Sequence, residues 1–462
     1  METSTTFRLN GETVTLAGVD PTQSLLRWLR ARSLSGTKEG CGDGDCGACT
    51  VVWLECDQQG ASQLVAVNSC LLPMGALPGR EVLTVEAVAD GDQLHPVQAA
   101  LSAHNGSQCG YCTPGIVMSL LAGYYGGELS DHTTDGNLCR CTGYRPIREA
   151  TSTLARRAQA NDRFRLMLAQ TRTAPAASRI GSFHSPVTLT DAIALKQQCP
   201  EAAFIAGATD LGVNLSRHQA VAPAFIALDR IAELQTLVIE TGQVRIGAGV
   251  PLTRLEHELS GLIPALDDML PWFAARQVRN RATIGGNLGS ASPIGDFAPL
   301  LLALDATVQV QGPNGLREIS IADFFLAYRK TALARDELIV SIHLPRATTQ
   351  TQGFYKIAKR QTDDISIVAA CFAIELDGEG RVRHVRLAFG GVAATPVRAR
   401  DVEQALMGQI LDTARIEAAR SALSATFSPL SDHRASADYR RALCGNLFVT
   451  FAREKLGLEA MA

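Results

Sequence analysis

Eight of the twelve cysteines fall into two sets of four whose spacing suits iron–sulfur chemistry. The first set is Cys41, Cys46, Cys49 and Cys70. Gaps of four residues and then two are typical of plant-type [2Fe–2S] proteins, in which four thiolates hold two bridged irons. Structural zinc is the alternative, but zinc sites usually draw on two short Cys pairs. The set therefore predicts a [2Fe–2S] cluster.

The loop that carries the first three of these cysteines is rich in glycine, with Gly40, Gly42, Gly44 and Gly47. Glycine tolerates the positive φ angles that a tight wrap around a small cluster needs, and its backbone N–H groups can face the sulfurs. Three of these glycines also spell G-x-G-x-x-G, but a dinucleotide site needs that string between a strand and a helix. Here it follows a predicted helix, so we reject that interpretation. Cys56 lies outside the pattern and is expected to be a small buried side chain.

The second set consists of two short pairs, Cys109 with Cys112 and Cys139 with Cys141. Each pair lies beside a predicted helix start, with Thr113 as N-cap before Pro114 in one case and Pro146 in the other. Helix N-termini carry partial positive charge, which suits an anionic cluster. Zinc is again the alternative, although a one-residue gap is unusual for zinc.

Three segments around these cysteines resemble the signatures of the molybdenum hydroxylases, which include xanthine dehydrogenases, aldehyde oxidases and carbon monoxide dehydrogenases. The segments are EGCGDGDCGACT (39–50), QCGYCTPG (108–115) and GNLCRCTGYRPI (136–147). They hold seven of the eight proposed ligands, and Cys70 fits by its position downstream. The resemblance implies that Gln108 lies between the molybdopterin cofactor and the second cluster. The stretch 128–137 looks shorter than is usual in the family, which leaves the local helix length open.

The resemblance also implies an FAD site in two segments. In AFIAGATDLG (203–212) a strand would deliver Gly207 to a tight turn, where glycine lets the backbone approach a pyrophosphate. In TIGGNLGSASPIGD (283–296) small residues would let the cofactor lie on the backbone, with Ser290 and Asp296 hydrogen-bonding ribityl hydroxyls. A plain core role is the alternative for Phe273 and Ile339. The residues implied as FAD neighbours are Ala203, Phe204, Ile205, Ala206, Gly207, Ala208, Thr209, Asp210, Leu211, Phe273, Thr283, Gly286, Asn287, Gly289, Ser290, Gly295, Asp296, Ile339 and Lys356.

An NAD site is implied beside the flavin. Asp363 and Asp364, in KRQTDD (359–364), resemble the family's stretch next to the nicotinamide nucleotide, and a solvated charged turn is the alternative. The resemblance assigns Asp210 and Asp363 to this site. The family's flavin fold is vanillyl-alcohol-oxidase-like rather than a Rossmann fold.

The elements that must position these residues follow from hydrophobic pattern and turn signals. Alternation over residues 7–16 around Asn10-Gly11 predicts a hairpin. Helices are predicted from Pro21 to Arg32, from Pro96 to Asn105-Gly106, from Pro114 to Tyr125, from Pro146 to about Ala160, and at 190–198, 411–427 and 436–456. Strands are predicted at 50–54, 63–67, 204–206, 244–246, 365–376 and 382–389, the last two joined at Asp377-Gly378-Glu379-Gly380.

The predicted fold class is multidomain α+β, and the boundaries come from these elements, the proline-broken stretch 171–178 and the resemblance. The domains are a plant-ferredoxin-like β-grasp [2Fe–2S] domain (1–87), a helical-bundle [2Fe–2S]-binding domain (88–160), a linker (161–178), a vanillyl-alcohol-oxidase-like FAD-binding domain (179–346) and an α+β C-terminal flavoprotein domain (347–462).

Composition excludes several other classes of protein. The net charge of −3 gives no basic surface for nucleic acid or an anionic membrane. No apolar run approaches the roughly 18–20 residues that span a bilayer, and the N-terminus lacks a signal-peptide pattern. We expect a cytoplasmic protein, where cysteines serve metal binding rather than disulfides.

The resemblance implies an electron-transfer subunit of xanthine dehydrogenase, which oxidises hypoxanthine and xanthine to urate with NAD⁺. A flavin can exchange single electrons with [2Fe–2S] clusters and a hydride with NAD⁺. The molybdopterin site would lie on a large partner subunit, in an α2β2 heterotetramer, with electrons reaching FAD through two clusters whose order comes from the resemblance. The alternatives are the same role in an aldehyde or other heteroaromatic hydroxylase, a flavin reductase that serves a soluble partner, and a non-catalytic metal-binding or assembly protein.

Overall fold

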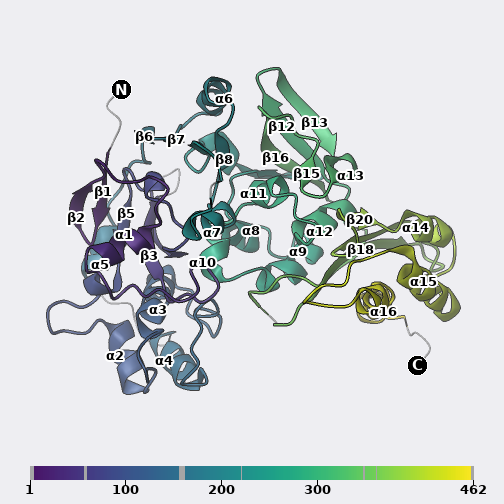
Figure 1. Ribbon diagram of the computed structural model, residues 1–462. Helices are drawn as coiled ribbons and strands as arrows, with labels where there is room; N and C mark the ends of the chain where they lie inside the picture. The colour runs from purple at the N-terminus through teal and green to yellow at the C-terminus, as the bar shows by residue number, and fades with distance from the viewer. Residues whose placement is uncertain are drawn as a thin grey trace. The chain divides into compact units, whose positions relative to one another are not determined.

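The computed structural model describes residues 5–56, 60–155, 162–219, 221–346, 349–360 and 362–458. It forms two compact units, whose helices and strands are labelled in Figure 1. The first unit comprises Met1–Ala232 together with Ala274–Ala282, and the second comprises Glu233–Phe273 and Thr283–Ala462.

A five-stranded mixed sheet opens the first unit, in the order β2-β1-β5-β3-β4. Its strands are β1 (Thr6–Leu9), β2 (Glu12–Thr15), β3 (Thr50–Cys56), β4 (Ser62–Asn68) and β5 (Glu81–Leu83). The β1–β2 hairpin predicted around Asn10-Gly11 is confirmed, and Gly11 takes φ 89° in its turn. The strands predicted at 50–54 and 63–67 are confirmed as β3 and β4, which pair antiparallel and return the chain to Cys70.

Helix α1 (Leu25–Ala31) packs on this sheet but begins later than predicted. Residues 21–24 form a turn instead, in which the Asp20 carboxylate accepts the Thr22 amide at 2.9 Å. The helix starts at its N-cap Ser24, whose hydroxyl accepts the Arg27 amide at 3.4 Å. The apolar face is buried as predicted, through Leu25, Leu26 and Leu29, and Trp28 joins it.

Four helices follow, and the first three of them form the predicted bundle. They are α2 (Pro96–Ala103), α3 (Thr113–Gly126), α4 (Arg145–Ala155) and α5 (Arg163–Leu168). Thr113 was the wrong N-cap: Cys112 caps α3 without a side-chain hydrogen bond, and the Thr113 hydroxyl donates to Ser107 at 2.7 Å. The predicted end of α4 at Ala160 lies outside the described residues.

Part of the predicted linker is folded. Helix α5 lies inside 161–178, and its Phe164 is only 2% exposed in the core of the helical bundle. Asp162 caps the helix by accepting the Phe164 and Arg165 amides at 3.0 and 3.2 Å. The polar stretch around Pro175 that follows suggested a linker and hid this cap signal. Residue 161 lies outside the described residues.

The first unit closes with a four-stranded sheet in the order β6-β7-β9-β8, where β9 pairs in parallel with both neighbours. These strands are β6 (Ser178–Ile180), β7 (Phe183–Ser185), β8 (Ala203–Ile205) and β9 (Phe225–Ala227), with helices α6 (Leu189–Gln198), α7 (Leu211–Ser216) and α10 (Arg276–Arg279). Phe183 and Phe225 share one apolar core with Phe7 and Trp28 of the first sheet.

The second unit begins with an antiparallel sheet in the order β10-β11-β16-β12-β13. Its strands are β10 (Leu237–Ile239), β11 (Gln243–Gly247), β12 (Thr307–Gly312), β13 (Gly315–Ser320) and β16 (Leu338–Pro345), and β14 (Phe325–Ala327) pairs separately with β15 (Lys330–Thr331). The helices are α8 (Leu252–Glu258), α9 (Pro264–Met269), α11 (Ile284–Gly289), α12 (Phe297–Ala303) and α13 (Ile321–Phe324). Short 3₁₀ turns lie at Met74–Ala76, Val85–Ala87, Ala232–Gln235 and Leu270–Trp272.

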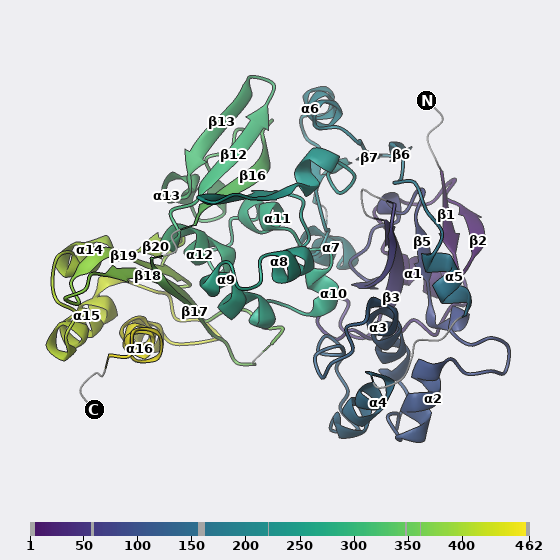
Figure 2. The same ribbon diagram turned by 180° about the vertical axis from the view of Figure 1, so that it is seen from behind.

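A second antiparallel sheet, β17-β18-β19-β20, ends the chain together with three helices (Figure 2). These elements are β17 (Thr351–Ile357), β18 (Val368–Leu376), β19 (Val382–Gly390), β20 (Val397–Arg398), α14 (Arg400–Leu406), α15 (Thr413–Thr426) and α16 (Ala437–Leu456). The predicted β18–β19 hairpin is confirmed, with Gly380 at φ 78°, but β18 begins at Val368 rather than at residue 365. Both closing helices are confirmed, and their apolar side chains share one core with the sheet.

Candidate redox cofactor sites

The first four cysteines form two thiol pairs. Cys41 hydrogen-bonds Cys46, and Cys49 hydrogen-bonds Cys70. The hydrogen bond with Cys46 lowers the pKa of Cys41 to about 5, whereas the pKa of Cys46 is raised. The hydrogen bond with Cys70 likewise lowers the pKa of the buried Cys49. In each pair the hydrogen bond favours the ionised form of one thiol, which is the form in which cysteine binds a metal.

The glycine-rich loop supports this arrangement from its backbone. The Asp43 and Cys46 amides donate to the Cys41 sulfur at 3.3 Å, and the Cys41 amide donates to the Cys46 sulfur at 3.3 Å. Gly42, Gly44 and Gly47 take φ 73°, 88° and 65°, as predicted. Gly40 does not; a Cβ on it would lie 2.6 Å from the Cys46 sulfur, so close approach requires glycine there.

The second four cysteines pair in the same manner, Cys109 with Cys141 and Cys112 with Cys139. Burial raises the pKa of Cys112 to about 12, with the Cys139 hydrogen bond contributing. The Cys139 sulfur lies 3.1 Å from the Thr142 hydroxyl, a contact that helps lower the pKa of Cys139 against the effect of burial. Cys109 and Cys141 are exposed, and so is Gln108 beside them.

Pairs of thiols fit a two-iron cluster, because each iron then takes two thiolates. Within the described ranges, no three or more His, Cys, Asp or Glu side chains are arranged around a single metal-ion position. The donor set and its pairing therefore fit two [2Fe–2S] clusters.

The first predicted flavin segment follows β8 in the first unit, where the structure gives Gly207 a different role from the expected one. A Cβ on Gly207 would lie 1.7 Å from the Arg281 carbonyl oxygen, so its missing side chain makes room for another stretch of this unit. Ala208, at φ 62°, makes the left-handed turn instead. Thr209 is half-buried and Asp210 is exposed just before α7.

Helix α7 continues from this segment onto the first thiol loop. A Cβ on Gly212 would lie 2.4 Å from the Leu71 carbonyl oxygen, next to Cys70. Arg217 holds the Asp43 carboxylate with two hydrogen bonds of 2.9 and 2.6 Å. The flavin segment and the first quartet are therefore directly connected within one unit, a contact that sequence spacing did not reveal.

The second flavin segment starts at the N-terminus of α11 in the second unit. Thr283 is the N-cap, and its hydroxyl accepts the Gly286 amide at 3.0 Å. Gly286 and Gly289 are exposed, and nothing lies within 4 Å of a Cβ built on Gly289. These open glycines leave a bare backbone surface of the kind a flat cofactor can approach. The Ser290 hydroxyl donates to the Asn287 carbonyl at 2.8 Å.

Asp296 and Lys356, both predicted flavin neighbours, form a buried ion pair in this unit. Their charged atoms are 2.8 Å apart, and each side chain is 5% exposed. The Ser366 hydroxyl also donates to Asp296, at 2.5 Å. Ser366 was missed from the sequence, since a single serine after KRQTDD carries no pattern. Buried charges are rare unless paired or functional, which marks this cluster as a candidate site.

Phe273 and Ile339 were both predicted as FAD neighbours, with a plain core role as the alternative, and their surroundings differ from each other. Half-buried Phe273 contacts Phe297 edge to face at 5.5 Å and lies 5.9 Å from the Lys356 ammonium, so it belongs to the ion-pair cluster. Ile339 is 7% exposed on β16, paired with Val310, as a core residue would be. Gly295 is half-buried, and a Cβ on it would lie 3.2 Å from the Asn287 amide oxygen.

The two aspartates assigned to NAD lie in different units, Asp210 in the first and Asp363 in the second. Asp363 takes φ 54° in a turn closed by Asp364, whose carboxylate accepts the Arg360 amide at 2.9 Å. These contacts are those of a charged turn at Asp363 and Asp364. The assignment of Asp210 and Asp363 to NAD stays a prediction.

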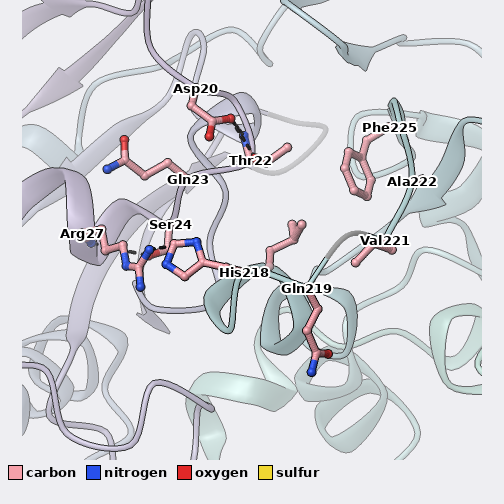
Figure 3. Close-up of a pocket in the computed structure, with 11 residues that line it drawn as sticks. Asp20, Thr22, Gln23, Ser24, Arg27, His218, Gln219, Val221, Ala222 and Phe225 are labelled. Atoms are coloured by element: carbon pink, nitrogen blue, oxygen red, sulfur yellow. Dashed lines mark hydrogen bonds between the residues drawn. The ribbon is translucent and has the colours of Figure 1, made fainter.

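A separate cavity of about 470 Å³ lies in the first unit (Figure 3). Its lining includes Arg27 and His218, whose side-chain nitrogens are 3.0 Å apart. None of the predicted cofactor residues lines this cavity.

Four family models match successive parts of the chain. They are a 2Fe-2S iron-sulfur cluster binding domain at 7–74, a [2Fe-2S] binding domain at 84–152, an FAD binding domain in molybdopterin dehydrogenase at 177–347 and a CO dehydrogenase flavoprotein C-terminal domain at 353–455. These matches confirm the predicted multidomain fold class, with two iron–sulfur domains, an FAD-binding domain and a C-terminal flavoprotein domain. The exact boundaries remain predictions.

Curated relatives cover nearly the whole chain. Xanthine dehydrogenase of Emericella nidulans is 33% identical over 97% of this chain, and that of Blastobotrys adeninivorans is 32% identical over 99%. The chain spans only 38% and 41% of the length of these two relatives.

Solved structures match more than half of the chain. Carbon monoxide dehydrogenase from Hydrogenophaga pseudoflava, in a form that lacks the Mo-pyranopterin moiety of its cofactor, is 29% identical with a TM-score of 0.56. It covers 62% of this chain, which in turn covers 98% of that one. Quinoline 2-oxidoreductase from Pseudomonas putida 86 is 26% identical with a TM-score of 0.55, over 58% of this chain and 94% of its own.

Proposed function

Because this chain belongs to the molybdenum hydroxylase family, we propose that it is the electron-transfer subunit of a xanthine dehydrogenase, which oxidises hypoxanthine and xanthine to urate with NAD⁺. The observation that carries the proposal is that two cysteine quartets lie in segments matched by two [2Fe-2S] domain models, on the same chain as an FAD-binding domain.

The residues have separable tasks. Cys41, Cys46, Cys49 and Cys70 would hold one [2Fe–2S] cluster, and Cys109, Cys112, Cys139 and Cys141 the other. Backbone amides of the glycine loop stabilise the thiolate form through N–H···S hydrogen bonds of 3.3 Å, which favours ligation and tunes the cluster.

On the flavin side, the second unit supplies most of the polar groups. Thr283 caps the first turn of α11, and the exposed glycines of this helix, Gly286 and Gly289, would let a cofactor approach its backbone. The Asp296–Lys356 pair would hold polar groups of the FAD while each charge keeps its counter-charge. The assignment of 203–211 to the FAD site stays a prediction. When bound, FAD exchanges single electrons with the clusters and a hydride with NAD⁺.

A large molybdopterin-binding partner is part of the proposal. The proposal is supported by the likeness to carbon monoxide dehydrogenase, an enzyme that has a molybdenum cofactor and of which a single chain is covered to 98% by this one. We propose a cytoplasmic α2β2 heterotetramer in which Gln108 and the exposed Cys109–Cys141 pair lie toward the partner's cofactor. None of the helices in the described ranges is long and apolar enough to cross a membrane.

A second candidate is the same electron-transfer role in another heteroaromatic or aldehyde hydroxylase. The likeness to quinoline 2-oxidoreductase favours it, since the substrate is set outside this chain. A non-catalytic metal-binding protein would need zinc in the thiol quartets, which the two-by-two pairing does not favour.

Purification from the native host tests the proposal. We expect a large molybdenum subunit to co-purify, about four irons per FAD on this chain, and NADH formation from xanthine. If the enzyme turned over another heteroaromatic substrate but not xanthine, the assignment to xanthine dehydrogenase would be wrong. The electron-transfer role of this chain would still stand. An iron-free chain without flavin would overturn both.

A further inference from the structure

A buried polar seam joins the two thiol quartets within the first unit. The Leu138 amide, next to Cys139, donates to the Cys46 carbonyl at 3.0 Å. The neighbouring Asn137 donates its side-chain amide to the Gly47 carbonyl at 2.9 Å. A Cβ on Gly115 would lie 2.2 Å from that same carbonyl oxygen, so the two ligand loops are in close contact.

Asn137 is the central residue of the seam, at 1% exposure. Its Nδ2 also donates to the Thr50 hydroxyl at 3.2 Å, and its Oδ1 accepts the Ser119 hydroxyl at 2.6 Å. The direction in which this amide points therefore decides whether Gly47 is held against the second quartet.

Gln277 completes the seam from α10, far along the chain. Its Nε2 donates to the Asn137 Oδ1 and to the Ser119 hydroxyl, both at 3.1 Å, and the side chain is 2% exposed. Its Oε1 faces the Gly136 backbone, where an added Cβ would lie 1.8 Å away, and has no hydrogen-bond donor among the described residues. A buried amide with one oxygen left unpaired costs free energy, so its retention calls for a specific role.

We propose that Gln277 is a positioning residue that fixes the spacing and electronic coupling of the two [2Fe–2S] clusters, which rests on the proposed function. By donating to Asn137 Oδ1, Gln277 forces the Asn137 NH₂ group toward Gly47 and thereby keeps the Leu138–Cys46 hydrogen bond closed. Gln277 lies in the part of the chain matched by the flavin-domain model. A residue of the flavin domain thus sets the contact between the iron–sulfur domains.

The test compares Gln277→Glu, Gln277→Leu and Arg276→Gln in the holoprotein. Glutamate keeps the shape but removes the N–H donors, and leucine removes both polar groups. Arg276 lies on the same helix and pairs with Glu128 at 2.8 Å outside the seam, so Arg276→Gln is the matched control. Electron paramagnetic resonance of the fully reduced chain reports the spin–spin splitting between clusters, and flash reduction reports transfer between them.

We expect both Gln277 variants to retain iron and FAD, with an altered splitting and several-fold slower transfer, while Arg276→Gln matches the parent. Unchanged splitting and rate in Gln277→Glu would overturn the proposal, even if Gln277→Leu failed to fold. Loss of iron from Gln277→Glu would overturn it too, because the residue would then hold ligands rather than their spacing. A parent chain with no clusters would instead remove the proposed function.

Discussion

Cys46 contributes two different groups to the iron–sulfur unit. Its thiol pairs with Cys41, and its carbonyl accepts the Leu138 amide from the second ligand loop. A substitution of the Cys46 side chain removes the thiol and leaves the Cys46 carbonyl available to the Leu138 amide. The loss of a cluster ligand can therefore be tested without breaking the hydrogen bond between the two ligand loops.

Cys46→Ser is expected to lower iron from about four to about two atoms per chain, because one quartet loses a thiolate while the other is intact. Iron analysis and visible absorption measure this. Cys56→Ser is the matched control, since Cys56 lies outside both quartets near the Ser62 hydroxyl at 3.7 Å. Equal iron loss in the two variants would argue against the ligand assignment.

Asp296→Asn is expected to lower the free energy of unfolding by about 3–5 kcal/mol, because it leaves the Lys356 ammonium buried without its counter-charge. Denaturant unfolding of the flavin-free protein measures it. Adding Lys356→Met should restore part of the stability but not FAD retention. If the double variant bound FAD as well as the parent, the pair would have no part in cofactor binding.

Single glycines show how far residue-level prediction reaches. Gly42, Gly44 and Gly47 could be predicted, because a turn around a cluster requires positive φ and only local sequence decides it. The role of Gly207 could not, since it depends on the Arg281 carbonyl about seventy residues away. Ser366 and Gln277 were invisible for the same reason: their partners lie far off in sequence.

At the scale of elements, α7 links the flavin segment to the first quartet. It carries Gly212 against Leu71 at one end and Arg217 against Asp43 at the other. A change in the position of this short helix is therefore felt at Cys70 and at the Cys41 loop.

Gly212→Ala is expected to destabilise the first unit by about 1–3 kcal/mol, because the new Cβ would lie 2.4 Å from the Leu71 carbonyl oxygen and force α7 outward. Thermal unfolding measures this, and the spectrum of the first cluster should change as well. Gly126→Ala, at the end of α3 with nothing within 4 Å, should be neutral or slightly stabilising. Equal effects of the two changes would contradict the close packing of α7.

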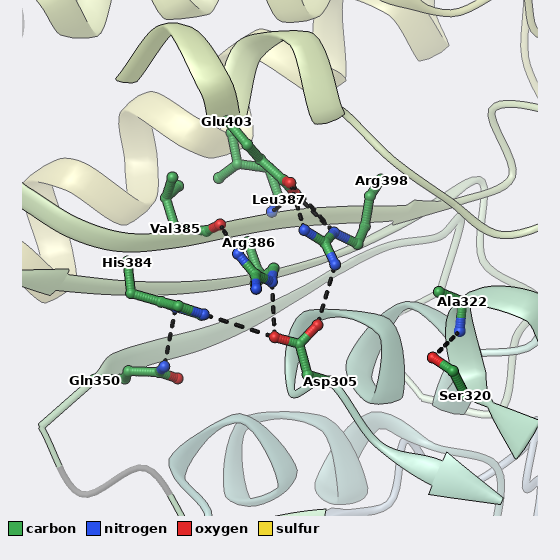
Figure 4. Close-up of polar contacts among 10 residues, drawn as sticks. All are labelled: Asp305, Ser320, Ala322, Gln350, His384, Val385, Arg386, Leu387, Arg398 and Glu403. Carbon is green, nitrogen blue, oxygen red and sulfur yellow. Dashed lines mark hydrogen bonds and ion pairs between the residues drawn. The ribbon is translucent and has the colours of Figure 1, made fainter. Parts of the chain in front are cut away.

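Asp305 joins α12 to the C-terminal sheet through three cationic or basic side chains (Figure 4). Its carboxylate contacts Arg386 at 2.7 Å, Arg398 at 3.0 Å and His384 at 3.6 Å. Burial alone would raise the pKa of Asp305, but the His384 hydrogen bond and the two arginines outweigh it, so the pKa is lowered. The contact therefore stabilises the fold above the unfolded-state pKa of about 3.9 and is lost as pH falls through the lower folded value.

Asp305→Asn should accordingly reduce amide protection of β19 at pH 7, and the difference from the parent should shrink below about pH 4. Hydrogen exchange, corrected for its intrinsic pH dependence, measures both. A difference that stayed constant down to acidic pH would show that the carboxylate charge contributes nothing.

Elements were predictable where pattern and cap agreed. The β18–β19 hairpin and the two closing helices follow from alternation, turn residues and periodicity that are all local. Helix α5 was not predictable, because the polar stretch around Pro175 suggested a linker, whereas the helix buries Phe164 in the helical core. Tertiary packing decided against the local signal.

At the scale of the whole molecule, the first unit is not continuous in sequence. The nine residues Ala274–Ala282 belong to it although the chain on both sides belongs to the second unit. Asn280 donates to the Ala66 carbonyl on β4 at 2.8 Å, and Arg281 lies 3.1 Å from the Asp229 carboxylate, which also holds Arg80 at 2.7 Å. The segment fills polar positions that 1–232 alone cannot satisfy.

A fragment ending at residue 232 is expected to unfold at a lower temperature and to lose iron faster than the full chain, because Asn137 and Asp229 lose partners in the interior. Fusing 274–282 to it through a flexible Gly-Ser linker should recover part of the loss. The same fusion with the equivalent of Gln277→Leu and Arg281→Leu is the control. A fragment as stable as the full chain would show that the returning segment is dispensable.

The segment Ala274–Ala282, which belongs to the first unit, also limits where recombination can divide the chain. A recombination crossover anywhere between residues 233 and 273 would give a hybrid the bulk of its iron–sulfur unit from one parent and residues 274–282 from the other. Such a hybrid would be stable only if the residues of the second parent at positions 277, 280 and 281 fitted their partners from the first parent. In this chain those residues are Gln277, Asn280 and Arg281. Exchange of flavin modules between lineages should therefore break after Ala282, and seldom in the interval between Glu233 and Phe273.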